Sequence, residues 1–110
     1  MNDELKKMKS ELNELFGEQE SNIEVASRAL KVMAHPARLK ILCILRDGEK
    51  NVQTLEILTD LAQANLSQHL SLLKDRGLVK SRRDGNFSFY RIADDRVLGL
   101  FEQVKEIYCD

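Results

Sequence analysis

Residues 52–92, VQTLEILTDLAQANLSQHLSLLKDRGLVKSRRDGNFSFYRI, contain the pattern that decides the fold. Within them Leu66, Leu70 and Leu73 are spaced at i, i+4 and i+7, which predicts an amphipathic helix with one apolar face. A shorter helical pattern precedes this helix. The tripeptide Asp84-Gly85-Asn86 lies between two β-rich runs and predicts the turn of a hairpin. Two short helices followed by a basic hairpin indicate a winged helix-turn-helix.

The face of the second helix opposite the leucines is polar and uncharged over about two turns. Ordinary surface helices also carry polar side chains outward, but their outer faces are usually rich in Glu and Lys. Short side chains with paired donors and acceptors are the types that read base edges in a major groove. The residues expected to face bases or phosphates are Gln63, Asn65, Ser67, Gln68 and His69.

Basic residues gather at the end of this helix and in the hairpin. The expected phosphate-binding residues are Lys74, Lys80, Arg82 and Arg83, with Asn86 at the hairpin turn. The net charge of the whole chain is −1, but residues 61–92 hold six basic against two acidic residues, whereas residues 1–24 hold three against seven. This distribution is typical of a local DNA-binding face on an otherwise acidic protein.

The 110 residues are expected to form a single α+β, mostly helical domain, 1–110. N-terminal helices are expected in 1–34, the helix-turn-helix in 52–76, the wing in 79–92 and a C-terminal helix in 95–110. The first and last helices are amphipathic, so they are either plain packing helices or dimerisation helices. A homodimer would place two recognition helices roughly 34 Å apart, which matches a palindromic operator in double-stranded DNA.

Other protein classes lack support in the sequence. No stretch approaches the roughly 18 apolar residues of a membrane span, and the first residues, MNDELKKMKSEL, lack the apolar core of a signal peptide. A cytoplasmic protein with no membrane partner is therefore expected. There is no Gly-rich phosphate loop and no plausible cluster of Ser, His and carboxylates, so neither an enzyme nor a cofactor is expected.

Two stretches carry a resemblance to a known family: AHPARLKIL at 34–42, and LSQHL at 66–70 followed by Leu73, GLV at 77–79 and Gly85. In this order and spacing the chain resembles the ArsR (arsenic-repressor) family of small dimeric winged-helix repressors over nearly its whole length. The resemblance implies a repressor whose operator affinity is switched by a small chemical signal.

The chain departs from this resemblance at the start of the recognition helix. Ala62 stands where relatives often have a Ser N-cap, a change that costs about 1 kcal/mol unless Asp60 substitutes for it.

The metal sites known in the resembling family have no counterpart here. The thiol-containing metal box falls on residues 50–55, KNVQTL, which contain no Cys. The other common site uses Asp and His on the last helix, where this chain has Asp94, Arg96, Ile107 and Asp110. A lone Asp94 cannot hold zinc, which takes about four N, S or O ligands. No metal site is expected.

The chain has two cysteines, Cys43 and Cys109. A pair at these places resembles the sulfide- and persulfide-responsive branch of the family, the BigR/SqrR/HlyU type, in which a disulfide or polysulfide bridge between two such cysteines releases DNA. A thiol sensor needs a thiolate, some exposure and a second Cys nearby. The alternative is that both are small apolar fillers, which suits Cys43 within ILCIL better than Cys109 near the end.

The leading hypothesis is therefore a homodimeric DNA-binding repressor that senses reactive sulfur species through Cys43 and Cys109. A repressor that responds to peroxide or general disulfide stress through the same thiols is a second hypothesis. A winged-helix module for protein interaction, without a DNA partner, is a third.

Overall fold

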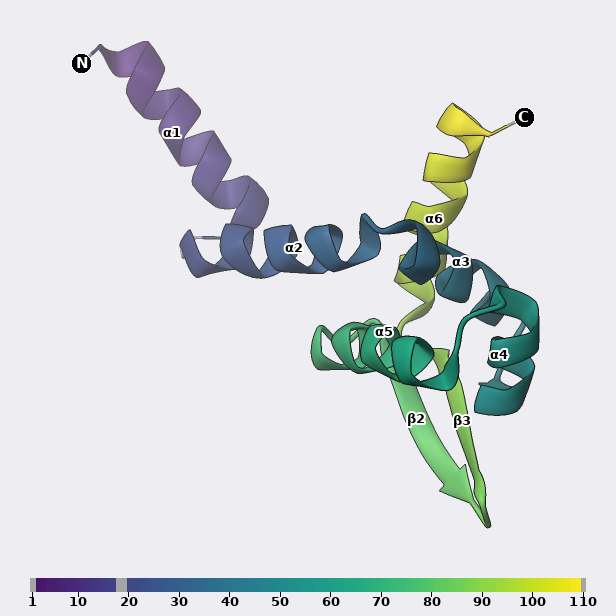
Figure 1. Ribbon diagram of the computed structural model, residues 1–110. Helices are drawn as coiled ribbons and strands as arrows, with labels where there is room; N and C mark the ends of the chain where they lie inside the picture. The colour runs from purple at the N-terminus through teal and green to yellow at the C-terminus, as the bar shows by residue number, and fades with distance from the viewer. Residues whose placement is uncertain (1, 18–19, 110) are drawn as a thin grey trace. The chain divides into compact units, whose positions relative to one another are not determined.

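The computed structural model describes residues 2–17 and 20–109, and the chain forms two compact units, Met1–Lys31 and Val32–Asp110. The described residues form six helices and a three-stranded sheet (Figure 1). The elements are α1 (Asp3–Phe16), α2 (Glu20–Met33), α3 (Pro36–Leu45), β1 (Lys50–Asn51), α4 (Val52–Thr59), α5 (Gln63–Asp75), β2 (Val79–Asp84), β3 (Phe87–Ile92) and α6 (Asp95–Tyr108). These bounds confirm the helix-turn-helix and the hairpin, while residue 110 of the expected last helix lies outside the described residues.

The first unit contains α1 and most of α2. Asn2 caps α1 by accepting a hydrogen bond from the backbone N–H of Leu5 at 2.9 Å, and acidic residues occupy the first turn, where they suit the helix dipole. The apolar stripe of α1 is open to solvent, with exposed fractions from 48% to 73% for Leu5, Met8, Leu12 and Leu15. An apolar stripe this exposed is free to pack against another chain.

The core of the second unit forms where α3, α4, α5 and the hairpin meet. The i, i+4, i+7 prediction is confirmed, because Leu66, Leu70 and Leu73 of α5 are at most 1% exposed. They pack in one cluster with Ile41 and Leu42 of α3. Replacing a leucine buried to this degree by Ala typically costs about 2–5 kcal/mol of unfolding free energy. The apolar face of α5 therefore holds its polar face in place.

The sheet is antiparallel in the order β1-β3-β2. The β2–β3 hairpin pairs Asp84 with Phe87 across a two-residue turn, and Gly85 takes the positive φ of 62° that such a turn demands. The expected single hairpin is thus joined by a third strand, β1, whose residue Lys50 pairs with Tyr90. Two residues are too few to show the alternation that marks a strand in a sequence.

The two ends of α5 differ in how they are capped. At its C-terminus Gly77, at φ 71°, allows the N–H of Leu78 to bond the carbonyl of Leu73 at 3.0 Å, as in a Schellman motif. At its N-terminus Ala62 supplies no side-chain hydrogen bond. Asp60 does not replace it, because Asp60 closes α4 in a left-handed conformation, with its N–H bonded to Glu56.

A polar cluster joins α3 to α5. Arg38 donates from Nε to the carbonyl of Val32 and lies with Nη1 3.3 Å from Nδ1 of His69, whose ring centroid is 4.8 Å from that of His35. Nδ1 of His35 accepts the N–H of Ala37 at 3.1 Å and so caps α3. Burial is the largest cause that lowers the pKa of His69, and the nearby His35 and Arg38 lower it further. The neutral imidazole is thus the form that suits this cluster.

No helix within residues 2–17 and 20–109 is long and apolar enough to cross a bilayer.

The lowered pKa of His69 predicts that stability rises with pH through the range in which this histidine loses its proton. Histidine in the unfolded chain has a pKa of about 6.5. At pH values below this pKa, the unfolded state binds more protons than the folded state. The contribution of His69 to the free energy of unfolding is therefore complete above the pKa of the unfolded state. It is lost as the pH falls through the pKa of the folded state. Denaturant titrations at several pH values should show the wild-type advantage over His69→Gln shrinking in acid. An advantage independent of pH would contradict this assignment.

The missing cap predicts that Ala62→Ser stabilises the protein. A Ser hydroxyl at this position can accept the backbone N–H of Ala64 or Asn65, which adds about 0.5–2 kcal/mol to the unfolding free energy. Urea denaturation measures the gain, and Ala64→Ser, two residues further along and within the helix, is the matched control that should give none. Equal effects of the two changes would show that capping is not their cause.

Candidate functional site

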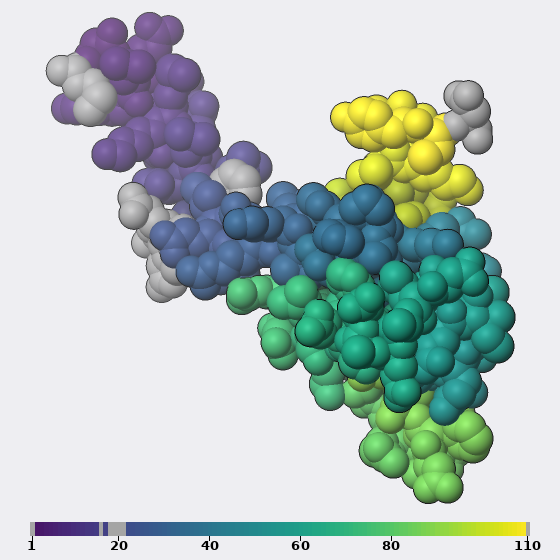
Figure 2. Space-filling model, viewed as in Figure 1, coloured from purple at the N-terminus to yellow at the C-terminus, as the bar shows by residue number. Residues whose placement is uncertain are grey.

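The polar face of α5 is open to solvent. Gln63, Asn65, Ser67 and Gln68 are exposed, as predicted, whereas His69 is half-buried and held in the cluster with Arg38. In Figure 2 the atoms of α4 and α5 form a continuous uncovered surface, beyond which the tip of the hairpin protrudes. This uncovered surface is available to a large partner.

A polar groove of about 240 Å³ connects the recognition helix to the hairpin. Four residues predicted from the sequence line it together: Gln63 and Ser67 from α5, and Arg83 and Asn86 from the hairpin. The groove also contains residues that the sequence analysis did not single out, namely Val52, Gln53, Leu70, Ser88 and Tyr90. The structure thus gathers amides, hydroxyls and one guanidinium around a single opening.

Strand alternation separates the basic residues of β2. Side chains two residues apart share a face of the sheet, so Arg83 lies on the face of the buried Val79, and Lys80 and Arg82 lie on the other. Arg83 reaches the groove from this position. Of the three basic residues of β2, Arg83 alone borders the recognition helix groove.

Arg82 is paired with Glu49, the residue before β1. Its Nη2 lies 2.6 Å from one carboxylate oxygen of Glu49 and its Nε 3.0 and 3.1 Å from the two oxygens, while the guanidinium stacks 4.5 Å from the centroid of Phe89. The hydrogen bond from Arg82 lowers the pKa of Glu49. Bidentate pairing of this kind fixes orientation, so Arg82 ties the hairpin to the start of β1. The predicted contact of Arg82 with phosphate stays a prediction.

Lys74 and Lys80 are exposed, as a phosphate contact requires. Neither lines the groove between α5 and the hairpin. Their predicted contacts with phosphate would therefore lie to the side of this groove.

Asp94 has a structural task. It caps α6 by accepting the N–H of Arg96 at 2.9 Å, and it also accepts bonds of 2.6 to 3.1 Å from the guanidinium of Arg96. Hydrogen bonds from Arg96 lower the pKa of Asp94 to about 2. In the part of the chain that the structure describes, no group of three or more His, Cys, Asp or Glu side chains is placed to hold a metal ion.

Cys43 and Cys109 line the same pocket, which has a volume of about 370 Å³. Cys43 is half-buried on α3, and Cys109 is exposed directly after α6, where its N–H bonds the carbonyl of Lys105 at 2.8 Å. Both are free thiols. The other lining residues are Leu39 and Lys40 from α3, Arg46 directly after it, and Phe101, Val104 and Lys105 from α6. The fold thus brings together two cysteines that are far apart in the sequence.

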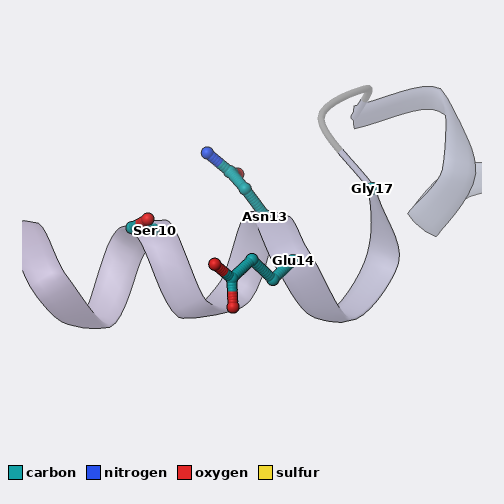
Figure 3. Close-up of a pocket in the computed structure, with 4 residues that line it drawn as sticks. All are labelled: Ser10, Asn13, Glu14 and Gly17. Atoms are coloured by element: carbon teal, nitrogen blue, oxygen red, sulfur yellow. The ribbon is translucent and has the colours of Figure 1, made fainter.

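A further pocket, in the first unit, lies on α1. It is lined by Ser10, Asn13, Glu14 and Gly17. Figure 3 shows Asn13 projecting away from the helix while Glu14 lies across it, so these side chains do not converge on one point. They form no candidate site.

Comparison with known proteins identifies the family of the chain. The family described as "Bacterial regulatory protein, arsR family" matches residues 35–81. The Biofilm growth-associated repressor of Agrobacterium fabrum is 44% identical over 80 residues, which are 73% of this chain and 68% of that protein. The Transcriptional activator HlyU of Vibrio cholerae is 39% identical over 92 residues, 84% of this chain and 85% of that protein.

Solved structures agree with these sequence matches. The structure of HlyU from Vibrio cholerae gives a TM-score of 0.76 at 38% identity and covers 84% of this chain and 100% of that one. A Mycobacterium bovis domain, described as a homodimeric winged helix-turn-helix DNA-binding domain, gives a TM-score of 0.74 at 34% identity. This match covers 79% of this chain and 81% of that one. The resemblance inferred from the motifs is confirmed: the chain belongs to the ArsR family of bacterial regulatory proteins, and it is a winged helix-turn-helix transcriptional regulator rather than an enzyme.

Proposed function

We propose that this regulator is a homodimeric repressor that binds a palindromic operator through α5 and the hairpin and releases it when reactive sulfur species bridge Cys43 and Cys109. The observation that carries the proposal is the pocket that the two thiols share. This pocket borders α3, and α3 packs against the recognition helix α5. In this proposal, oxidation of the two thiols is the signal and release of the operator by α5 and the hairpin is the response.

The groove between α5 and the hairpin supports the DNA contact. Amides such as Gln63 present paired donors and acceptors to base edges, and Arg83 beside them supplies a fixed positive charge for the phosphate backbone. A docking surface for a protein partner has no need of a guanidinium at this place.

Exposed apolar side chains support the homodimer. Besides the stripe of α1, the end of α6 exposes Ile107 at 68% and Tyr108 at 81%. The Mycobacterium bovis domain with the same fold is described as homodimeric. In a dimer the two recognition helices would meet successive major-groove faces roughly 34 Å apart.

The proposed chemistry is a two-step sulfur transfer. One thiolate attacks the outer sulfur of a persulfide, RSSH, which forms a Cys–SSH group and expels RS⁻. The second thiolate attacks the inner sulfur of Cys–SSH, which forms the Cys43–Cys109 disulfide and expels HS⁻. Two thiols are thereby oxidised and one sulfane sulfur is reduced to sulfide. In a longer chain, Cys–S–S–SH, attack on the sulfur next to the terminal one would expel HS⁻ and retain one extra sulfur in the bridge.

The groove geometry predicts different roles for two neighbouring arginines. Arg83→Ala should weaken binding to every duplex and reduce the slope of log affinity against log salt by about one per subunit. Arg82→Ala should lower stability through loss of the Glu49 pair and change the salt slope less. Fluorescence anisotropy over a salt series measures both, with Arg28→Ala in α2 as the control.

Gln68→Ala should instead relax base specificity, with the salt slope unchanged, because an amide reads bases and neutralises no phosphate. Competition between operator and unrelated duplexes measures this. Wild-type binding by both Arg83→Ala and Gln68→Ala would refute the proposed DNA face.

The thiol proposal predicts that polysulfide weakens operator binding about 5–150-fold, the range of a coupling energy of about 1–3 kcal/mol. Cys43→Ser and Cys109→Ser should keep their affinity, since neither can form the bridge. Mass spectrometry should find sulfur added to, or two hydrogens lost from, the wild type. Equal loss of affinity in all three proteins would rule out the cysteines as the sensor, and equal responses to polysulfide and peroxide would favour general disulfide stress.

A further inference from the structure

The pocket shared by Cys43 and Cys109 is larger than a bridge between two cysteines needs. At about 370 Å³ it falls within the range of about 300–1,000 Å³ typical of sites for small organic molecules. Leu39 on α3 and Phe101 and Val104 on α6 give it an apolar wall. A void walled by apolar groups gains free energy when an apolar body fills it.

The charges at the pocket have one sign. Lys40, Arg46 and Lys105 line it, and no acidic residue does. Arg46 is partly neutralised, since its guanidinium lies 3.9 Å from Glu102 and 3.6 Å from Asp47. Lys40 and Lys105 form no ion pair with any residue in the described ranges. Their apolar stems can extend the wall while the ammonium groups reach its edge.

We propose that this pocket binds an amphipathic carboxylate without covalent chemistry, with the apolar body against Leu39, Phe101 and Val104 and the carboxylate paired with Lys40 and Lys105. Within the described residues, Lys40 and Lys105 are cations without an ion-pair partner at the edge of an apolar wall. This arrangement suits an acid group on an alkyl chain better than a neutral or cationic molecule. A bound molecule of this class occupies the space between the two thiols.

Occupancy therefore has a chemical consequence. Bridging requires the sulfur atoms of Cys43 and Cys109 to come within bonding distance, and a molecule seated in the pocket holds them apart and shields Cys43 from reagents. Binding itself is independent of the proposed function. Its effect on DNA release rests on that function, because the ligand would protect the repressor from reactive sulfur.

Calorimetry on the reduced full-length protein tests the binding. Decanoate is the probe, and decanol and decyltrimethylammonium, with the same chain and no negative charge, are the controls. Decanoate should bind more tightly than either. The double variant Lys40→Gln/Lys105→Gln should bind it about tenfold more weakly, because both exposed ion pairs to the carboxylate are lost. Lys31→Gln, on α2, should bind as wild type does.

Two further measurements locate the ligand and separate the two proposals. Decanoate should shift amide resonances of α3 and α6 and should slow alkylation of Cys43 by iodoacetamide. The Cys43→Ser/Cys109→Ser protein should still bind decanoate, so binding would stand even if the sulfur response failed. Absence of decanoate binding, equal affinity for all three probes, or shifts confined to α1 would overturn the proposal.

Discussion

The packing of α3 against α5 is the interaction on which the other features depend. Ile41 and Leu42 on one side of α3 meet Leu66 and Leu70 of α5 with almost no exposed surface. Close-packed interiors transmit displacement rather than absorb it. Because the opposite side of α3 carries Cys43, one helix borders both the thiol pocket and the core that holds the recognition helix. The thiol pocket and the recognition helix therefore lie on opposite sides of α3.

The hairpin is held by different means. The Glu49–Arg82 pair and the short strand β1 tie it to the segment that leads into α4, while strand alternation directs Arg83 to the groove. An exposed ion pair contributes little to stability, about 0–1 kcal/mol. Its value here is orientation, since a bidentate pair stacked on Phe89 restricts how the hairpin sits beside α5.

Local signals in the sequence predicted the helices, the hairpin turn and the buried leucines, because period and turn chemistry act over a few residues. They also identified Gln63, Ser67, Arg83 and Asn86, which the fold brings to one groove. They missed β1, Glu49 and Gln53, whose roles arise from contacts between distant segments. Cys43 and Cys109 were paired by resemblance alone. Their shared pocket follows from the packing of α6 on α3, which no local pattern encodes.

If the thiol pair is the sensor, a change there should reach the recognition helix through α3. Amide hydrogen exchange, compared between the reduced protein and the protein bridged by polysulfide, measures this residue by residue, since exchange reports local opening free energies. We expect altered protection in α3 and α5 together, including the amides of Leu66 and Leu70. Altered protection confined to α6 and the C-terminal residues, with α5 unchanged, would contradict it.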